Sequence, residues 1–176
     1  MKRQVSWALV AAGAAVAAAV ATAAPAAAVT SGSQTVKGII VASGVSGTRT
    51  VINSVVIFKG AFSGTGKIVE VDNLPTDPDN VTRDDLVFAT GSMHIVNTIE
   101  DYSLSTNPRS CVFTATLHQT NVIAGGTGQF TAASGDFTAI VTGRGVFPRN
   151  PDGSCDDSRD PLHEVDMITG TGTLSF

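Results

Sequence analysis

Two side chains in the middle of the chain have the chemistry to bind a ligand or move a proton. His94 lies in a run of alternate residues, 86–98, that changes from apolar to polar, as at the mouth of a pocket or along a partly exposed strand. Tyr102 is the only tyrosine and lies beside Glu100 and Asp101 near a predicted strand end. Its hydroxyl could donate a proton at the rim of a cavity, or stay in water while the ring packs.

A second pair of candidate ligand-binding residues, Asp136 and Arg144, lies on one face of a predicted strand. The other face of that strand carries Phe137, Ala139 and Val141 and is typical of a core. Asp136 and Arg144 therefore become pocket groups only if the interior of the fold contains water. The other two histidines, His118 and His163, are expected to face solvent.

No familiar catalytic arrangement appears among these residues. The sequence shows no Ser-His-Asp order, no pair of carboxylates at glycosidase spacing and no histidine cluster, so it names no catalytic residue. Acidic stretches at 77–85 and 152–157 offer oxygen ligands for calcium, but neither has the spacing of an EF-hand. Solvated turns explain both stretches equally well. We therefore expect no cofactor and no metal, and calcium binding by these loops stays open.

The two cysteines, Cys111 and Cys155, are best explained as a structural disulfide. An exported chain with an even number of cysteines usually oxidises them, and two cysteines allow one intramolecular pairing. A catalytic thiol or a metal pair is the alternative. It fits less well because no further Cys or His stands nearby at ligand spacing.

Residues 1–28 have the features of a secretory signal peptide. Lys2 and Arg3 precede an apolar, alanine-rich stretch, and the alanines at 26–28 are typical of a cleavage site. A retained membrane anchor is the alternative, but alanine is only weakly lipophilic. We expect cleavage before Val29 and a secreted product with no membrane attachment.

The remaining chain, 29–176, has the size of one domain. It holds nine basic and fifteen acidic side chains. This acidic balance argues against nucleic acid, because neutralising phosphates needs a basic face. It also disfavours binding to anionic membranes.

The pattern of this domain alternates with period two and is interrupted by Gly, Pro, Asn and Asp. No stretch after the signal shows a sustained helical period. The expected strands are Thr35–Ala42, Thr50–Phe58, Lys67–Val71, Asp85–Thr98, Ser110–Ile123, Phe137–Val146 and Val165–Phe176, with a short or irregular eighth at Gln129–Ala133. Seven or eight short strands in one domain predict a sandwich or a closed barrel.

The segment Gly125-Gly-Thr-Gly-Gln-Phe-Thr-Ala-Ala-Ser-Gly135 resembles a glycine-rich stretch of dirigent proteins and allene oxide cyclases. The resemblance implies an all-β fold: a single eight-stranded antiparallel closed barrel whose interior can hold a small hydrophobic molecule. It also implies that copies of the chain can pair through the barrel exterior as a homo-oligomer. Plant members place acidic, basic and tyrosine side chains inside the barrel, but no such position is carried over to this chain.

These observations favour a secreted barrel that binds a small hydrophobic molecule or a partner without catalysis. The alternative is a cyclase or isomerase that shapes a hydrophobic substrate inside the barrel, which leaves a weak trace in sequence. A buried Asp, Glu or Tyr with a strongly shifted pKa inside the cavity would favour the enzyme. Sugar binding and an outer-membrane barrel are less consistent with nine aromatic residues after the signal, eight Phe and one Tyr.

Overall fold

The computed structural model describes residues 30–45 and 47–176. The predicted signal peptide, 1–28, lies outside the described residues, so its cleavage stays a prediction. The described residues form eight strands and one short 3₁₀ helix, in the order β1 (Ser31–Ser43), β2 (Thr50–Gly60), β3 (Gly64–Val71), β4 (Val81–Phe88), β5 (Gly91–Thr106), β6 (Val112–Gly126), η1 (Gly128–Phe130), β7 (Ser134–Val146) and β8 (His163–Ser175).

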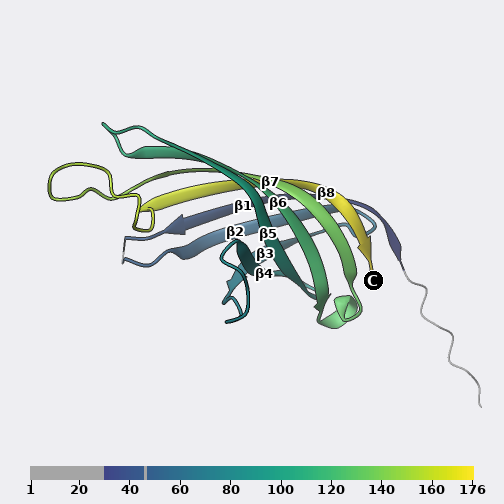
Figure 1. The fold of residues 1–176 in the computed structure, drawn as a ribbon. Helices are drawn as coiled ribbons and strands as arrows, with labels where there is room; N and C mark the ends of the chain where they lie inside the picture. The colour runs from purple at the N-terminus through teal and green to yellow at the C-terminus, as the bar shows by residue number, and fades with distance from the viewer. Residues whose placement is uncertain (1–29, 46) are drawn as a thin grey trace, which may run out of the picture.

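The strands form one closed antiparallel barrel (Figure 1). Each strand pairs with the next along the chain, and β8 returns to pair with β1 from Ser31 opposite Ser175 to Ala42 opposite Glu164. Every strand therefore has a neighbour on both sides, which limits pairing with other chains. The predicted eight-stranded closed barrel is confirmed, and the sandwich is excluded.

Two of the expected strands differ from those of the structure. The segment predicted as one strand, Asp85–Thr98, spans the end of β4, a tight turn and the start of β5. Gly91 permits this turn because its φ is 143°, which L side chains rarely adopt. Alternating apolar residues continue across the turn, so the pattern alone did not reveal it. The expected eighth strand, Gln129–Ala133, is wrong: η1 and a turn occupy it, and the missing strand is β4.

The short helix η1 and the C-terminus lie at the same end of the barrel (Figure 1). A cluster of phenylalanines, which includes Phe176, closes this end. Phe62 forms edge-to-face contacts with Phe88 and Phe130, each with ring centroids 5.0 Å apart. Further rings of the cluster belong to Phe58, Phe137 and Phe176. Aromatic edge-to-face pairs add specific attraction to the burial of apolar surface. Aromatic packing therefore closes this end of the barrel.

The opposite end carries the β1–β2, β3–β4, β5–β6 and β7–β8 connections. Cys111 and Cys155 form a disulfide there, as predicted, which ties the start of β6 to the long β7–β8 connection. Such a bond is compatible with an oxidising, extracellular environment. Among the residues that the structure describes, no helix is long and apolar enough to span a membrane.

Candidate functional site

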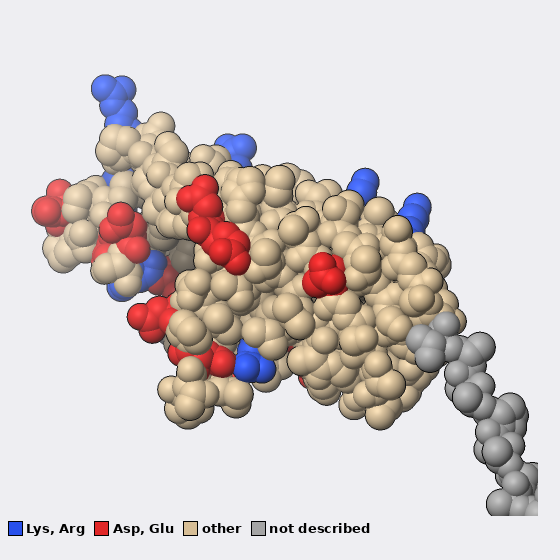
Figure 2. All heavy atoms as spheres, turned by 45° about the vertical axis from the view of Figure 1, so that its right-hand side comes forward, with Lys and Arg blue, Asp and Glu red and all other residues tan. Residues whose placement is uncertain are grey.

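A cavity of about 1210 Å³ opens at the end of the barrel that carries the disulfide. Figure 2 shows acidic side chains gathered towards this end, around a hollow in the surface. The cavity reaches down to Ile40, Ile68 and Ile168 on the inner faces of β1, β3 and β8. The barrel therefore has one sealed end and one open end, and the open end is the candidate site.

The cavity also opens sideways, between β2 and β3. These two strands pair over three residue pairs, from Val56 opposite Gly66 to Phe58 opposite Gly64, and diverge beyond Val56. The Ser54 hydroxyl bridges the gap: it donates to the Ile68 carbonyl at 2.6 Å and accepts from the Ile68 amide at 2.9 Å. The Ser54 side chain thus takes the place of backbone hydrogen bonds between β2 and β3, and the two strands separate around the cavity.

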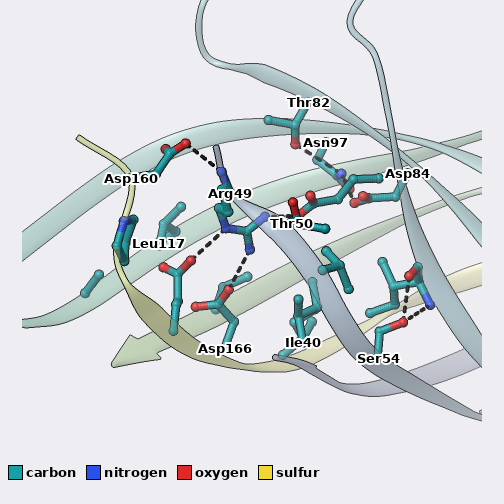
Figure 3. A pocket seen from close by; sticks show the side chains of 18 of the residues that line it. Ile40, Arg49, Thr50, Ser54, Thr82, Asp84, Asn97, Leu117, Asp160 and Asp166 are labelled. Carbon is teal, nitrogen blue, oxygen red and sulfur yellow. Dashed lines mark hydrogen bonds and ion pairs between the residues drawn. The ribbon is translucent and has the colours of Figure 1, made fainter. Parts of the chain in front are cut away.

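One wall of the cavity is built on Arg49, which lies in the β1–β2 connection (Figure 3). Its guanidinium binds Glu70 on β3 and, on β8, Glu164 at 2.7 Å and Asp166 at 3.2 Å. Burial alone would lower the pKa of Arg49, but hydrogen bonds and charge from Glu164 and Glu70 raise it above its ordinary value. One permanent cation is therefore surrounded by three carboxylates.

Asp166 is the most buried of these three carboxylates, with 8% of its surface exposed. Burial and the neighbouring Glu164 charge raise the pKa of Asp166 to about 6, although Arg49 acts in the opposite direction. The Asp166 carboxyl therefore takes up a proton more readily than an exposed aspartate does.

A chain of polar side chains crosses the floor of the cavity. Asn97 Nδ2 donates to Asp84 Oδ2 at 2.7 Å, and Asn121 Nδ2 donates to Asn97 Oδ1 at 2.6 Å. Burial raises the pKa of Asp84 to about 6 despite the hydrogen bond from Asn97 (Figure 3). Below this chain lies a void of about 60 Å³ among apolar side chains such as Val56 and Phe58. The polar chain thus lies where the cavity meets the apolar interior, and Asp84 lines both the cavity and the void.

The wall opposite Arg49 is mainly apolar. It is formed by β5, β6 and β7 and by the residue that follows β7, through Tyr102, Leu104, Phe113, Leu117, Val141 and Phe147. Phe113 and Phe147 stack with ring centroids 4.4 Å apart. Acidic and apolar walls that face each other suit a guest with both apolar and polar parts.

Of the four predicted ligand-binding residues, Tyr102 alone lies at the cavity. Burial and the charges of Glu164 and Asp157 raise its pKa. His94 lies on the outside, where its Nδ1 contacts Asp85 Oδ1 at 2.6 Å. The turn at Gly91 makes β5 a separate strand, and β5 turns Met93, Ile95 and Asn97 inward instead.

Asp136 and Arg144 also lie outside the cavity, on the exposed face of β7. Asp136 accepts a hydrogen bond from Thr173 at 3.1 Å. The inward face of β7 carries Phe137, Ala139 and Val141, as the pattern predicted. The structure therefore does not bring Asp136 and Arg144 together with the cavity groups.

The acidic loops are occupied by turns and ion pairs. Arg83 donates to both oxygens of Asp77, and its guanidinium lowers the pKa of that carboxyl to about 2. Asp152 and Asp156 accept hydrogen bonds from Ser154 and Ser158, in the manner of Asx turns. Within residues 30–45 and 47–176, no group of three or more His, Cys, Asp or Glu is arranged to hold a metal ion.

The polar residues that define the cavity were not among the ligand-binding residues predicted from the sequence. Asp84 was grouped with the acidic loop but belongs to β4 and faces inward. Asn97 and Asn121 lie on the inner, otherwise apolar faces of their strands. Ile95 is two residues before Asn97 on β5, and Ile123 is two residues after Asn121 on β6. A polar residue in the apolar phase of a strand is the signal that could have identified them, since a buried amide needs a partner.

Changing Asp84 to Asn is expected to raise the free energy of unfolding at pH 7.5 by about 1–2 kcal/mol, since one pKa unit corresponds to about 1.4 kcal/mol. The pKa of Asp84 is about 6 in the folded chain and 3.8 ordinarily, so the folded state binds the proton more tightly. The wild-type chain should therefore gain stability as pH falls from about 6 to about 4. Urea unfolding at several pH values measures this.

The matched control is Asp85→Asn, which removes the same charge from the neighbouring residue on the outer face. Its side chain is 31% exposed and pairs with His94, so a change within about 0.5 kcal/mol is expected. Equal stabilities of the wild-type chain and the Asp84→Asn variant from pH 4 to 7.5 would contradict the prediction.

Comparison of the chain with protein-family models, with curated proteins and with solved structures finds no match. The fold and the cavity geometry are therefore the grounds on which a function is argued.

Proposed function

We propose that this chain is a secreted β-barrel protein that binds a small molecule with an apolar body, without catalysis. The observation that carries the proposal is the cavity of about 1210 Å³, open at one end of the barrel and sealed by phenylalanines at the other. Small-molecule sites are concave, largely apolar and equipped with a few placed polar groups. The apolar wall would hold the body of the guest, and the acidic wall would orient it.

The closed sheet favours a rigid, preformed binding site over one that changes shape when a guest binds. Eight paired strands hold the cavity walls in fixed register, and the disulfide fixes the β7–β8 connection at its rim. A preformed cavity loses little conformational entropy when a guest enters. The carboxylates around Arg49 are already engaged in ion pairs, which suits an orienting role.

One observation favours the alternative, a cyclase or isomerase. Asp84 and Asp166 face the cavity, and burial raises the pKa of each to about 6. Carboxyl groups with a pKa near neutrality can take up and return a proton during a reaction. Tyr102 adds a hydroxyl at the rim. Turnover of oxylipin-like or polyketide-like substrates, abolished by Asp84→Asn, would establish this alternative.

Secretion and self-association belong to the same proposal. The predicted signal peptide at 1–28 and the disulfide both support an extracellular location, and N-terminal sequencing of protein from the culture medium tests it. The homo-oligomer implied by the family resemblance stays a prediction. Sedimentation of the purified chain would decide between a monomer and a dimer or trimer.

Narrowing the cavity beside its apolar wall should weaken binding of an apolar guest. Leu117→Trp places an indole into the cavity from β6, and we expect it to weaken binding of the apolar dye Nile red at least tenfold. The matched control is His118→Trp, because the next residue along the strand points outward and is exposed. Fluorescence titration measures both variants, and circular dichroism checks that each retains the fold.

Native mass spectrometry of the secreted protein provides the direct test. We expect a small molecule to remain bound to the wild-type chain and to be lost from the Leu117→Trp variant. Equal Nile red affinity in both variants, or no binding by the wild-type chain, would reject the proposed cavity.

A further inference from the structure

We propose that the cavity takes a protonated amine on an apolar body, with its ammonium group bound at the floor between Asp84 and Asn121. This inference rests on the proposed function and names the chemical class of the guest. It follows from the direction of the hydrogen bonds at the floor, from the balance of charge in the cavity and from the void beneath.

The floor presents hydrogen-bond acceptors to a guest. Asn97 donates through Nδ2 to Asp84 and, at 3.3 Å, to Thr82, and its Oδ1 accepts from Asn121. Both N–H groups of Asn97 are therefore used, and its oxygen accepts one hydrogen bond. Asn121 is 8% exposed, and its Oδ1 is buried with no hydrogen-bond partner among the described residues. Asp84 accepts through Oδ2, and its Oδ1 accepts no hydrogen bond from the described residues.

An unpaired buried acceptor is costly, and a donor from a guest would remove that cost. Asn121 and Asp84 both line the void of about 60 Å³, and Asp84 also lines the main cavity. A guest that enters from the open end therefore reaches Asp84 first and Asn121 beyond it. An ammonium group has three donors and no acceptor, so two of its N–H groups can pair with these two acceptors.

The charge of the cavity favours a cation over a neutral donor. Seven acidic and four basic residues line it. Two of the basic residues are bound to carboxylates outside the lining: Arg83 to Asp77, and Arg159 to Asp156. Arg49 is shared among three carboxylates. A carboxylate guest would meet this negative charge, whereas an ammonium guest would offset it.

The size and lining of the void determine which part of the guest it can hold. A volume of about 60 Å³ is sufficient for an ammonium group and the first methylene carbons. Phe58, Ile68 and Ile168 line the void together with the two polar groups, so the methylenes meet apolar atoms. The rest of the body would lie along the apolar wall, near Leu117 and Phe113.

The test compares three six-carbon probes by isothermal titration calorimetry on the disulfide-bonded protein at pH 7.5. Hexylamine carries the cation, hexan-1-ol donates without charge, and hexanoate carries the opposite charge. We expect hexylamine to bind at least tenfold more tightly than hexan-1-ol, and hexanoate to bind at least tenfold more weakly. Hexylamine binding no tighter than hexan-1-ol binding would overturn the inference.

The variant pair Asp84→Asn and Asp85→Asn locates the ammonium group. We expect Asp84→Asn to reduce the preference for hexylamine over hexan-1-ol to within twofold, because it keeps the shape of the floor and removes its charge. Asp85→Asn changes charge equally on the outer face and should keep the full preference. A full preference retained in Asp84→Asn would overturn the proposed position.

A pH series gives a test that needs no variant. The affinity of the wild-type chain for hexylamine should fall at least fivefold from pH 7.5 to pH 5, whereas that for hexan-1-ol should not change. Hexylamine keeps its proton throughout, so the change reports the protein. The charged groups around the floor are Arg49, Glu70, Asp84, Asp85, Glu164 and Asp166, with His94 beyond Asp85 on the outer face. An affinity for hexylamine independent of pH would contradict the inference.

The two proposals fail in different ways. If Nile red and hexan-1-ol bind and hexylamine gains nothing, the amine inference is wrong and the binding function stands. If neither Nile red nor any of the three probes binds, the proposed function itself is wrong, and the inference falls with it.

Discussion

Replacing Cys111 and Cys155 together with alanine is expected to lower the free energy of unfolding by about 4 kcal/mol. The disulfide joins positions 44 residues apart, and closing a loop of that length reduces the entropy of the unfolded chain by about this amount. The bond also holds the β7–β8 connection at the rim of the cavity. Asp160 in that connection accepts a hydrogen bond from the Arg49 backbone at 2.7 Å, so the acidic wall should loosen as well.

Guanidinium unfolding measures the loss, and reduction of the wild-type chain provides the matched control. A reducing agent should reproduce the loss in the wild-type chain and leave the double variant unchanged. A difference below about 1 kcal/mol between the oxidised wild-type chain and the double variant would mean that the loop is restrained in the unfolded state by other contacts.

Most of the strands could be predicted because period-two alternation and turn residues are local signals. The hairpin between β4 and β5 was not predicted because its turn residues, Ala89 and Thr90, are not typical of turns. The glycine that the turn requires, Gly91, follows them. Barrel closure is different in kind. It depends on pairing between β1 and β8, at opposite ends of the chain, and no local pattern encodes that pairing. The glycine-rich segment at 125–135 was the one feature that favoured a barrel over a sandwich.

The cavity was harder to predict than the fold, because strand register decides which side chains face inward. Asp84 and Asp85 are adjacent in the sequence, yet Asp84 lines the cavity and Asp85 pairs with His94 outside. Arg49 lies in a connection between strands and acquires its role from Glu70 and Glu164, which are distant in the sequence. Tyr102 was identified because a lone tyrosine near a strand end is a local feature.

The sealed end of the barrel depends on Phe130, which is fully buried. Phe130 is the last residue of η1, and its ring contacts Phe62, Phe88 and Phe176. The glycines around η1 allow it to fold back over the barrel: Gly128 has a φ of 59°, and a Cβ there would lie 2.2 Å from the Thr90 carbonyl oxygen. The glycine-rich segment therefore serves to place one aromatic ring.

Phe130→Ala is therefore expected to lower the free energy of unfolding by about 3–5 kcal/mol, as for other large-to-small changes in a core. The neighbouring rings come from the β2–β3 connection, from β4 and from the chain terminus, so they cannot collapse together to fill the space. Gln129→Ala changes an exposed neighbour in the same turn and should cost less than about 0.5 kcal/mol. Urea unfolding of the two variants measures both changes. A loss below about 1 kcal/mol in Phe130→Ala would show that the phenylalanine cluster does not hold this end closed.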